Sequence, residues 1–533
     1  MIRTREMASM CALVGLIASC ATDDTDPVDT ASSELARADH AAFAVTTEGL
    51  IRGTETDAMR AFRGIPYAAA PVGDLRWKPP QRHARWHNVL DTTQFAAHCA
   101  QIAGPFGQAS GDEDCLFLNV YTPANHRFAL RPVMVWIHGG ALVTGESDDY
   151  DATRLVDQGD VIVVTINYRL GGLGFTAHPA LSAESPNHAS GNYGLLDQQE
   201  ALRWVRRNIL LFGGDPSRVT IFGESAGGLS VHAQLASPGS HGLFQRAIVE
   251  SGAYQLTQPS LAAGEAAGVA FATSAGCPDQ TAACLRGLSV AQVLAHQAGG
   301  VGGASPVIDG TFLPQSVGAA FASGAFNRVP VIEGSNHDEW RLFVGLTTLV
   351  TGPTPAAAYP AAIQATLGVP AAIVPLFVAQ YPLASFASPD LALSALGTDG
   401  IFDCNARFAA TQLAKFVPTY AYQFADPSAP QRFLPPVSFP YGAAHASEIQ
   451  YLFDLPVTVP APAFDANQRK LSDAMVAYWT TFARTGQPTS FSTPLWQRYR
   501  AEVDSVQSLV PPTPRPDAGF AADHRCAFWD SLR

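Results

Sequence analysis

Residues 223–227 read GESAG and place Ser225 between two glycines in a G-x-S-x-G pattern. In this pattern a sharp turn between a strand and a helix exposes the serine hydroxyl, and the flanking glycines let neighbouring backbones pass closely. A neutral serine hydroxyl is a poor nucleophile, so it needs a base and an acid that orients that base. We therefore predict that Ser225 is a nucleophile. A glycine-rich turn without catalysis is the alternative that this segment alone leaves open.

Strand-like and helix-like runs alternate from Thr46 onward and predict the frame that would hold such a site. Residues 133–137 (VMVWI) and 161–166 (VIVVTI) are continuous apolar or β-branched runs, as in strands that are buried on both faces. Residues 197–211 start with acidic residues, as helices often do, carry apolar side chains at helical spacing and end before a Gly-Gly-Asp-Pro stop. A further short strand is predicted at 219–222, directly before the turn. This alternation indicates an α/β fold with a mainly parallel sheet covered by helices.

Composition limits the class of protein. The chain has 533 residues, of which 47% are hydrophobic and 15% are charged, so most of it must bury a core. Its net charge is −13, and it has few lysines and no basic run, which argues against nucleic acid as a partner. No internal repeat or linker-like stretch divides residues 43–533, so we predict one large domain there.

The N-terminal residues predict export. A short basic start precedes an apolar segment at 7–19 that is too short to span a bilayer, as in a secretion signal. The segment ends in Ile-Ala-Ser before Cys20, which resembles the bacterial lipoprotein box. We predict a signal peptide at 1–19 and a lipidated Cys20 that starts an acidic, flexible tether at 20–42. The protein would then be held in the bacterial cell envelope, at the surface or in the periplasm. The alternative is an ordinary signal peptide and a secreted protein.

Six cysteines remain once Cys11 and Cys20 are set aside, and an even number in an exported chain suggests disulfides. Their spacing alone does not select a pairing. No CxxC pair or His/Cys cluster has the spacing of a zinc site, so we expect no metal.

Many separate blocks of the sequence resemble the type-B carboxylesterase/cholinesterase family. Residues 113–121 (EDCLFLNVY) are similar to its second signature, and residues 223–228 (GESAGG) are similar to its active-serine signature. Further blocks fit in the right order along nearly the whole mature chain, at 62–68, 136–141, 167–169, 191–195, 243–248, 482–486 and 526–529. The resemblance is nearest in kind to bacterial para-nitrobenzyl-esterase-type carboxylesterases. It implies the α/β-hydrolase fold.

The resemblance also implies the base and the acid. Residues 444–449 (AHASEI) resemble the block around the family's catalytic histidine, which makes His445 the base. A histidine suits this role because its pKa lets it accept and return a proton near neutral pH. Residues 334–339 (GSNHDE) resemble the block whose final glutamate orients that histidine, which makes Glu339 the acid. Asp338 is the rival for this position.

The order Ser225, Glu339, His445 is that of nucleophile, acid and base in α/β-hydrolases. These residues are more than a hundred positions apart in turn, so only a folded sheet brings them together. Trp340 stands directly after the acid, where family members usually have glycine. We expect the backbone at this point to be shaped differently.

Acyl transfer also needs hydrogen-bond donors aimed at the developing oxyanion. The resemblance assigns this role to the backbone amides of Gly140, Ala141 and Ala226. Many members carry a third glycine where this chain has Ala141, and we expect the extra methyl group to narrow the pocket. Ser251 and Glu448 match polar positions behind the triad, with a purely structural role as the alternative.

By the same resemblance the six cysteines pair in three disulfides. Closing loops of this kind stabilises a fold by roughly 3 to 5 kcal/mol on chain-entropy arguments. We expect stabilising bonds, not redox centres, in the pairs Cys99–Cys115, Cys277–Cys284 and Cys404–Cys526.

The implied reaction is hydrolysis of a small-molecule carboxylic ester through a Ser225 acyl-enzyme, without metal or organic cofactor. Cholinesterases have a tryptophan in the loop between the first cysteine pair, and residues 100–114 here contain none, so choline esters are disfavoured. We expect short to medium acyl chains. The Ala/Pro/Leu-rich residues 342–396 could line an apolar pocket or form core.

Two alternatives remain open at this point. A lipase acting on longer-chain lipids is the nearest rival. A catalytically inactive cell-surface binding module of the same family is the rival from another class, although such modules typically lack the nucleophile that Ser225 supplies here.

Overall fold

The computed structural model describes residues 40–125, 129–298, 304–456 and 458–533. The predicted signal peptide, Cys20 and most of the predicted tether lie outside these residues. The described part begins with a strand, β1 (His40–Val45), which pairs antiparallel with β2 and buries Ala42 and Ala44. This strand includes residues 40–42, just before the domain boundary expected at residue 43.

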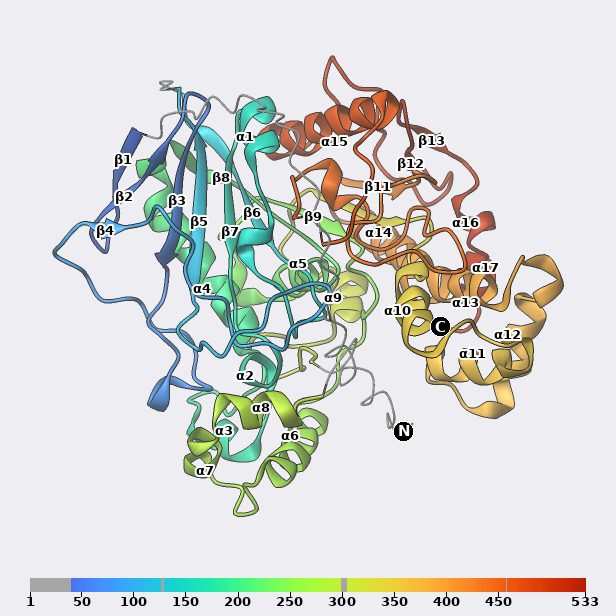
Figure 1. Ribbon diagram of the computed structural model, residues 1–533, viewed down its shortest axis with the longest axis horizontal. Helices are drawn as coiled ribbons and strands as arrows, with labels where there is room; N and C mark the ends of the chain where they lie inside the picture. The colour runs from blue at the N-terminus through green and yellow to red at the C-terminus, as the bar shows by residue number, and fades with distance from the viewer. Residues whose placement is uncertain (1–39, 126–128, 299–303, 457) are drawn as a thin grey trace, which may run out of the picture.

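A 13-stranded sheet forms the centre of the protein (Figure 1). Its order is β1-β2-β3-β5-β7-β6-β8-β9-β10-β11-β12-β13, with β4 beside β2. The pairs from β7 through β6 and β8 to β12 are parallel, and the outer pairs at both ends are antiparallel except β2 with β4. The strands after β1 are β2 (Leu50–Glu55), β3 (Met59–Pro66), β4 (Leu90–Asp91), β5 (Phe117–Pro123), β6 (Arg131–Ile137), β7 (Ile162–Ile166), β8 (Gly214–Glu224), β9 (Arg246–Glu250), β10 (Val331–Asn336), β11 (Thr419–Phe424), β12 (Val506–Leu509) and β13 (Arg515–Asp517).

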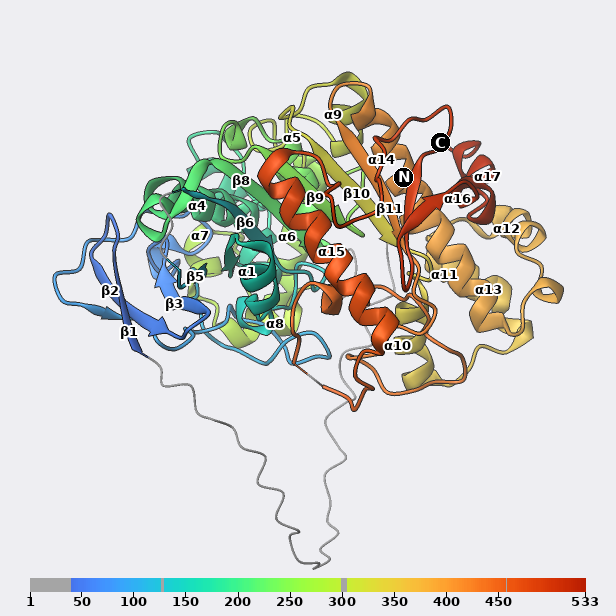
Figure 2. The same ribbon diagram turned by 90° about the horizontal axis from the view of Figure 1, so that it is seen from above.

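Helices cover both faces of the sheet, which explains why its central strands are continuously apolar (Figure 2). On β6, Val133 and Val135 face a core shared with α4, α5, α9 and α14, whereas Met134 and Trp136 face a core shared with α1 and α15. The helices are α1 (Thr153–Gly159), α2 (Gly171–Phe175), α3 (Pro179–Glu184), α4 (Tyr193–Asn208), α5 (Ala226–Ala236), α6 (Leu261–Ala275), α7 (Ala282–Gly287), α8 (Val290–His296), α9 (Val317–Ser323), α10 (Arg341–Thr351), α11 (Tyr359–Leu367), α12 (Val374–Gln380), α13 (Pro389–Gly397), α14 (Cys404–Ala414), α15 (Ala466–Thr485), α16 (Phe520–Asp523) and α17 (Cys526–Asp530).

The three strands predicted from apolar runs are confirmed as β6, β7 and β8, although β8 begins earlier than expected. The helix predicted at 197–211 begins four residues earlier, at Tyr193. Asp197 does not cap it. Its carboxylate is buried and accepts hydrogen bonds from Nε and Nη2 of Arg169, both at 2.7 Å. The acidic start of this segment therefore reflects a buried ion pair and not a helix end.

The six cysteines form the three disulfides that the resemblance predicts, Cys99–Cys115, Cys277–Cys284 and Cys404–Cys526. The second joins the end of α6 to α7, and the third joins the start of α14 to the start of α17.

Helices α10 to α13 form a lobe at the end of the molecule opposite β1–β4 in both views (Figures 1 and 2). They pack around their own apolar cluster, so residues 342–396 form a local core. Its buried members include Tyr359, Ile363, Val374, Phe377 and Leu396. Among the described residues, no single helix is long and apolar enough to cross a membrane. One pair of helical segments, Ala356–Leu367 and Ala371–Ser385, bent by 120°, meets the length and composition criteria jointly.

Candidate active site

Ser225 lies between the end of β8 and the start of α5, as the G-x-S-x-G pattern predicts. Its backbone has φ 55° and ψ −119°, a strained conformation of the kind found at functional sites. The glycine before and the glycine after it lie against the β6 backbone. A Cβ added to Gly227 would be 1.9 Å from the carbonyl oxygen of Ile137, and one added to Gly223 would be 2.5 Å from the same atom. Only glycine permits this approach.

Glu339 and His445 follow β10 and β11, which are parallel neighbours on the same side of β8 in the sheet. Because the carboxyl ends of parallel strands meet at one edge, both residues reach the edge that holds Ser225. Nδ1 of His445 lies 2.5 Å from Oε2 of Glu339, and both side chains are buried. The other oxygen, Oε1, accepts a hydrogen bond from the Ser251 hydroxyl at 2.5 Å and one from the Asn336 amide at 2.8 Å.

The carboxylate of Asp338, the rival acid, contacts different residues. It pairs with Arg341 at 2.8 Å and with His337 at 3.1 Å, and it accepts a hydrogen bond from the Ala443 amide at 3.0 Å. Burial opposes its ionisation, but these partners hold the pKa of Asp338 below its usual value. The structure therefore brings Glu339, and not Asp338, against His445.

Among the described residues, no hydrogen bond joins His445 to Ser225. Within the described residues Nε2 of His445 has no hydrogen-bond partner. Oε1 of Glu224, the residue before Ser225, lies 3.2 Å from this nitrogen. Nucleophile–base contacts are often long in enzymes without substrate and tighten when substrate binds. The structure thus joins Glu339 and His445 directly and places His445 beside the residue that precedes Ser225.

Glu224 and Glu250 are buried carboxyl groups for which no role was predicted from the sequence. Burial, and then the charges of Glu339 and Glu250, raise the pKa of Glu224 well above its usual value. Burial raises the pKa of Glu250 to about 8, although Trp479 donates a hydrogen bond to it at 2.9 Å. The position of Glu224 inside the serine motif and of Glu250 directly before Ser251 was the available signal.

Glu448 is buried as well, and burial followed by the charge of Glu224 raises its pKa well above the usual range. Its Oε2 accepts a hydrogen bond from Nδ2 of Asn336 at 2.5 Å. The Asn336 side chain also donates to the Ala444 carbonyl at 2.9 Å, next to His445. Hydrogen bonds thus connect Glu448 through Asn336 to the residue before His445, and Ser251 to Glu339.

The loop after β6 lies against Ser225, as expected for an oxyanion-binding loop. A Cβ added to Gly139 would lie 3.3 Å from Cβ of Ser225. Gly140 and Ala141 have φ of 94° and 55°, so the methyl group of Ala141 stands on a backbone that favours glycine. In the described part of the chain their amides donate no hydrogen bond. Ala226 is the first residue of α5, where an amide has no acceptor inside the helix.

Aromatic rings surround the free side of His445. The rings of Phe343 and Phe402 lie 5.2 Å and 4.9 Å from its imidazole, centroid to centroid. Trp340 lies 4.4 Å from Phe343 and occupies the space beside Gly397, where an added Cβ would be 2.2 Å from its ring. Trp340 has φ −73° and ψ −7°, which any residue adopts, so the backbone after the acid carries no unusual shape.

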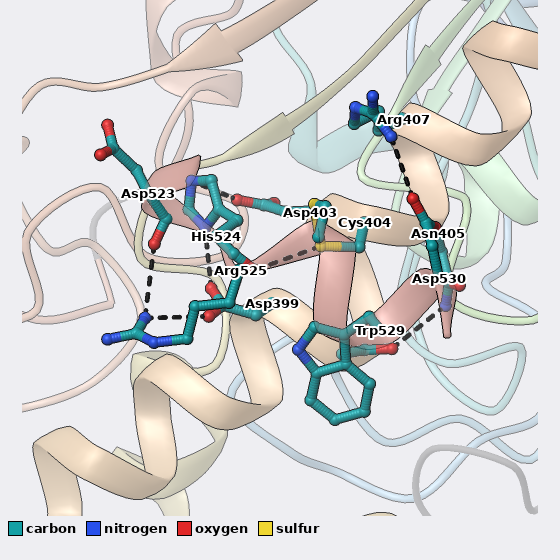
Figure 3. Close-up of a disulfide and its surroundings, with 12 residues drawn as sticks. Asp399, Asp403, Cys404, Asn405, Arg407, Asp523, His524, Arg525, Trp529 and Asp530 are labelled. Carbon is teal, nitrogen blue, oxygen red and sulfur yellow. Dashed lines mark hydrogen bonds and ion pairs between the residues drawn. A yellow bond between two sulfur atoms is a disulfide. The ribbon is translucent and has the colours of Figure 1, made fainter. Parts of the chain in front are cut away.

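Behind Phe402 lies a buried ionic cluster centred on His524 (Figure 3). Nδ1 of His524 lies 2.8 Å from Oδ1 of Asp399, and Nε2 lies 2.9 Å from Oδ2 of Asp403. Burial alone would lower the pKa of His524, but the two carboxylates outweigh it and raise the pKa to about 10. Both aspartates lie on a π-helix, Thr398–Asp403, which also carries Phe402. The sequence did not reveal this cluster, because its parts are about 120 residues apart.

Among the described residues no group of three His, Cys, Asp or Glu side chains could hold a metal ion. A carboxylate and aromatic rings contact His445, and the loop after β6 lies against Ser225. They suit acid–base and acyl-transfer chemistry carried out by the chain's own side chains.

Comparison with known proteins identifies the chemistry of this arrangement. Residues 40–529 match the model of the carboxylesterase family. The chain is 38% identical to acylcarnitine hydrolase of Mus musculus over 479 residues, which cover 84% of this chain and 83% of the mouse protein. It is 36% identical to para-nitrobenzyl esterase of Bacillus subtilis (strain 168) over 484 residues, which cover 86% and 93% of the two chains.

Bile salt-activated lipase of Bos taurus is also similar, with 36% identity over 511 residues that cover 85% of this chain and 80% of the bovine protein. The family match spans the sheet, the serine turn and the elements that carry Glu339 and His445. The chain therefore belongs to the carboxylesterase family and is an α/β-hydrolase that acts on carboxylic esters.

Proposed function

We propose that the protein is a serine carboxylesterase that uses Ser225 as nucleophile, His445 as base and Glu339 as the acid that orients the base. The observation that carries this proposal is the 2.5 Å contact between His445 Nδ1 and Glu339 Oε2, with Nε2 left without a hydrogen-bond partner among the described residues beside the strained serine turn. This leaves Nε2 available to take a proton from the serine hydroxyl.

In the proposed cycle, Nε2 of His445 accepts the Ser225 proton as Oγ attacks the ester carbonyl. The imidazolium then returns the proton to the departing alcohol, which leaves an acyl group on Oγ. Water activated by the same nitrogen releases the acid. Glu339 stabilises the imidazolium in both halves, and its own second oxygen is held by Ser251 and Asn336.

The tetrahedral oxyanion would be bound by the backbone amides of Gly140, Ala141 and Ala226. These amides are free, and the Gly139 backbone lies against Ser225. Removing one such donor typically costs roughly 3 to 4 kcal/mol of barrier. Because a backbone amide donates equally well from alanine, the methyl group of Ala141 should alter pocket size and not the number of donors.

The proposed substrates are small esters with short to medium acyl chains, and the similarity to a protein named para-nitrobenzyl esterase supports a small ester. The rings of Phe343 and Phe402 beside His445 support a compact apolar site. Hydrolysis of longer-chain lipid is the second candidate, supported by the similarity to bile salt-activated lipase and by the apolar lobe formed by α10–α13.

We also propose that the protein is exported and anchored in the cell envelope by a lipid on Cys20. The support is the N-terminal sequence, together with three disulfides that suit an oxidising compartment. Metabolic labelling with a fatty-acid analogue tests it: the native chain should carry the label and a Cys20→Ser variant should not. A label that persists in the variant would overturn the anchor.

The catalytic proposal is tested with p-nitrophenyl esters from acetate to palmitate. Ser225→Ala should lose roughly a million-fold in kcat, the scale expected for a missing serine nucleophile. Ser217→Ala, which changes an exposed serine on the same strand β8, should keep wild-type rates. After treatment with a fluorophosphonate, mass spectrometry should find the adduct on Ser225 alone. An adduct elsewhere would refute the mechanism, and a wild-type protein inert on every ester would favour an inactive binding module.

A further inference from the structure

Residues 342–389 contain no Asp, Glu, Lys, Arg or His, although 15% of the whole chain is charged. They include α10, α11 and α12 and lead into α13. The two ionisable residues that flank this stretch are both engaged. Arg341 pairs with Asp338, and Asp390 is buried and accepts a hydrogen bond from the Thr354 amide at 3.0 Å. The lobe therefore presents an uncharged surface on a protein whose net charge is −13.

The hairpin of α11 and α12 is the most apolar part of this lobe. From residue 367 to residue 379 no side chain is polar. The inner faces of both helices pack into the lobe core through Ile363 and Phe377, so the hairpin is firmly held. Its outer face is solvent-exposed, with Ile373 at 43% and Leu376 at 46% exposure, and the neighbouring residues Ala371, Ala372, Pro375 and Ala379 are exposed as well.

Such a surface departs from the usual pattern of a surface helix, in which the outer face is charged or polar. Exposed apolar surface of this kind marks a contact with a protein, a ligand or a membrane. Two observations favour a membrane. The two helical segments together have the length and hydropathy of a membrane span, and the uncharged outer face would bury no ionisable group in lipid.

We propose that the outer face of the α11–α12 hairpin, centred on Ile373 and Leu376, is a docking surface for a neutral phospholipid bilayer. The helices lie on the bilayer and insert their exposed apolar side chains into the interface without crossing it. Binding draws on buried apolar area alone, because the hairpin carries no basic residue to attract anionic headgroups. The net charge of −13 instead disfavours anionic membranes.

Docking at this hairpin would serve the neighbouring site. Both ends of the lobe lead to residues that contact His445. At one end α10 carries Phe343, and at the other α13 continues into the π-helix that carries Phe402. A lobe seated on lipid thus holds His445 close to esters dissolved in the bilayer. This last consequence rests on the proposed esterase function, whereas the docking itself does not.

The test uses the full chain with Cys20→Ser, so that no lipid on Cys20 contributes, and sucrose-loaded vesicles of phosphatidylcholine. Co-sedimentation measures the partition coefficient. The double change Ile373→Glu/Leu376→Glu should lower it at least about tenfold, the effect of keeping two large aliphatic side chains out of lipid. The matched control is Leu210→Glu/Leu211→Glu. Those leucines are 54% and 51% exposed on a short helix at the β1 end of the molecule, and the control should bind within about twofold of the parent.

Binding should also be insensitive to salt and should not rise when phosphatidylserine replaces part of the phosphatidylcholine. No binding by the parent, equal loss in both double variants, or binding that requires anionic lipid would each overturn the proposal. Sedimentation velocity separates a further outcome: a dimer that the Ile373→Glu/Leu376→Glu change dissolves would make this face a contact between copies and refute lipid docking. Circular dichroism confirms that the variants fold. Hydrolysis of p-nitrophenyl acetate in the same samples tests the proposed function separately, since its loss leaves vesicle binding unaffected.

Discussion

Oε1 of Glu224 lies 3.2 Å from Nε2 of His445, the nitrogen that the proposed mechanism uses to deprotonate Ser225. Two groups therefore compete for the space at this nitrogen, a carboxyl group and the serine hydroxyl. The charge on the carboxyl group decides what it does there. Burial raises the pKa of Glu224 well above its usual value, which favours the neutral carboxyl group over an ion pair with the imidazole.

Glu224→Gln should therefore keep most of the activity, because a neutral amide replaces a neutral carboxyl group of the same shape. We expect kcat/KM for a short p-nitrophenyl ester at pH 7 to change by less than about fivefold, or about 1 kcal/mol. Glu224→Ala, which also leaves a cavity, should lose more. A loss of a hundredfold or more in the glutamine variant would mean that the ionised carboxylate is the working form.

Glu339→Gln should abolish most of the turnover while Asp338→Asn should not. The first removes the carboxylate that orients and stabilises the imidazolium, an effect of about 10⁴ in kcat in comparable triads. The second removes a partner of Arg341 and leaves the His445 contact intact, so it should cost about 1 to 3 kcal/mol of stability and little activity. Steady-state kinetics and urea unfolding of both variants check this, and the reverse pattern would make Asp338 the acid.

His524→Gln should destabilise the fold in a pH-dependent way. At pH 6 we expect a loss of about 3 to 5 kcal/mol, because the buried carboxylate of Asp403 loses its cation and that of Asp399 keeps only Arg525, at 3.3 Å. The folded-state pKa of about 10 exceeds the ordinary value of 6.5, so the charge stabilises fully below pH 6.5 and its contribution declines as pH rises towards 10. Urea unfolding at several pH values should show the gap between wild type and variant shrinking across that window.

A matched control for this experiment is His178→Gln. This buried histidine contacts Oε1 of Gln280 through Nε2 at 2.9 Å and has no carboxylate partner within the described residues. Its cost should not vary over the same pH range. A wild-type–His524→Gln gap that stays constant from pH 6.5 to 10 would show that the imidazole is not charged in the folded protein.

Gly397→Ala should destabilise the fold by about 1 to 3 kcal/mol, because the new methyl group would stand 2.2 Å from the Trp340 ring. In a Trp340→Ala background the same substitution should cost almost nothing, since the ring is gone. A double-mutant cycle on the free energy of unfolding measures this coupling. Additive effects would mean that the ring moves aside freely.

The central fold was predictable because it depends on local sequence, whereas Glu339 and His445 were assigned by resemblance. The apolar runs at 133–137 and 161–166 had to be strands buried on both faces, and the GESAG turn carried its own geometry in its glycines. Pairing of the cysteines followed from resemblance and not from spacing, which left the pairing open.

The parts that sequence reasoning missed are contacts between residues that are distant in the chain. Nothing near His524 indicates that Asp399 and Asp403 will enclose it, and the π-helix that positions them has no sequence signature of its own. Asp197 was taken as the start of a helix because acidic residues are common in the first turn of a helix. The sequence alone does not distinguish such a residue from one that forms a buried ion pair. Glu224 was visible in the serine motif, but its approach to His445 depends on how β8 and the loop after β11 meet.

The fit of the Trp340 ring beside Gly397 links two positions that lie far apart in the chain. An engineer who randomises either position alone will mostly recover the starting residue, because a larger residue at 397 collides and a smaller one at 340 leaves a hole beside Phe343 and Phe402. Libraries that vary both codons together avoid this barrier. The variant with small residues at both 340 and 397 is less stable, but it has no collision and can accept a new pair of residues. A stabilised parent is therefore the better starting point for changing the side chains around His445.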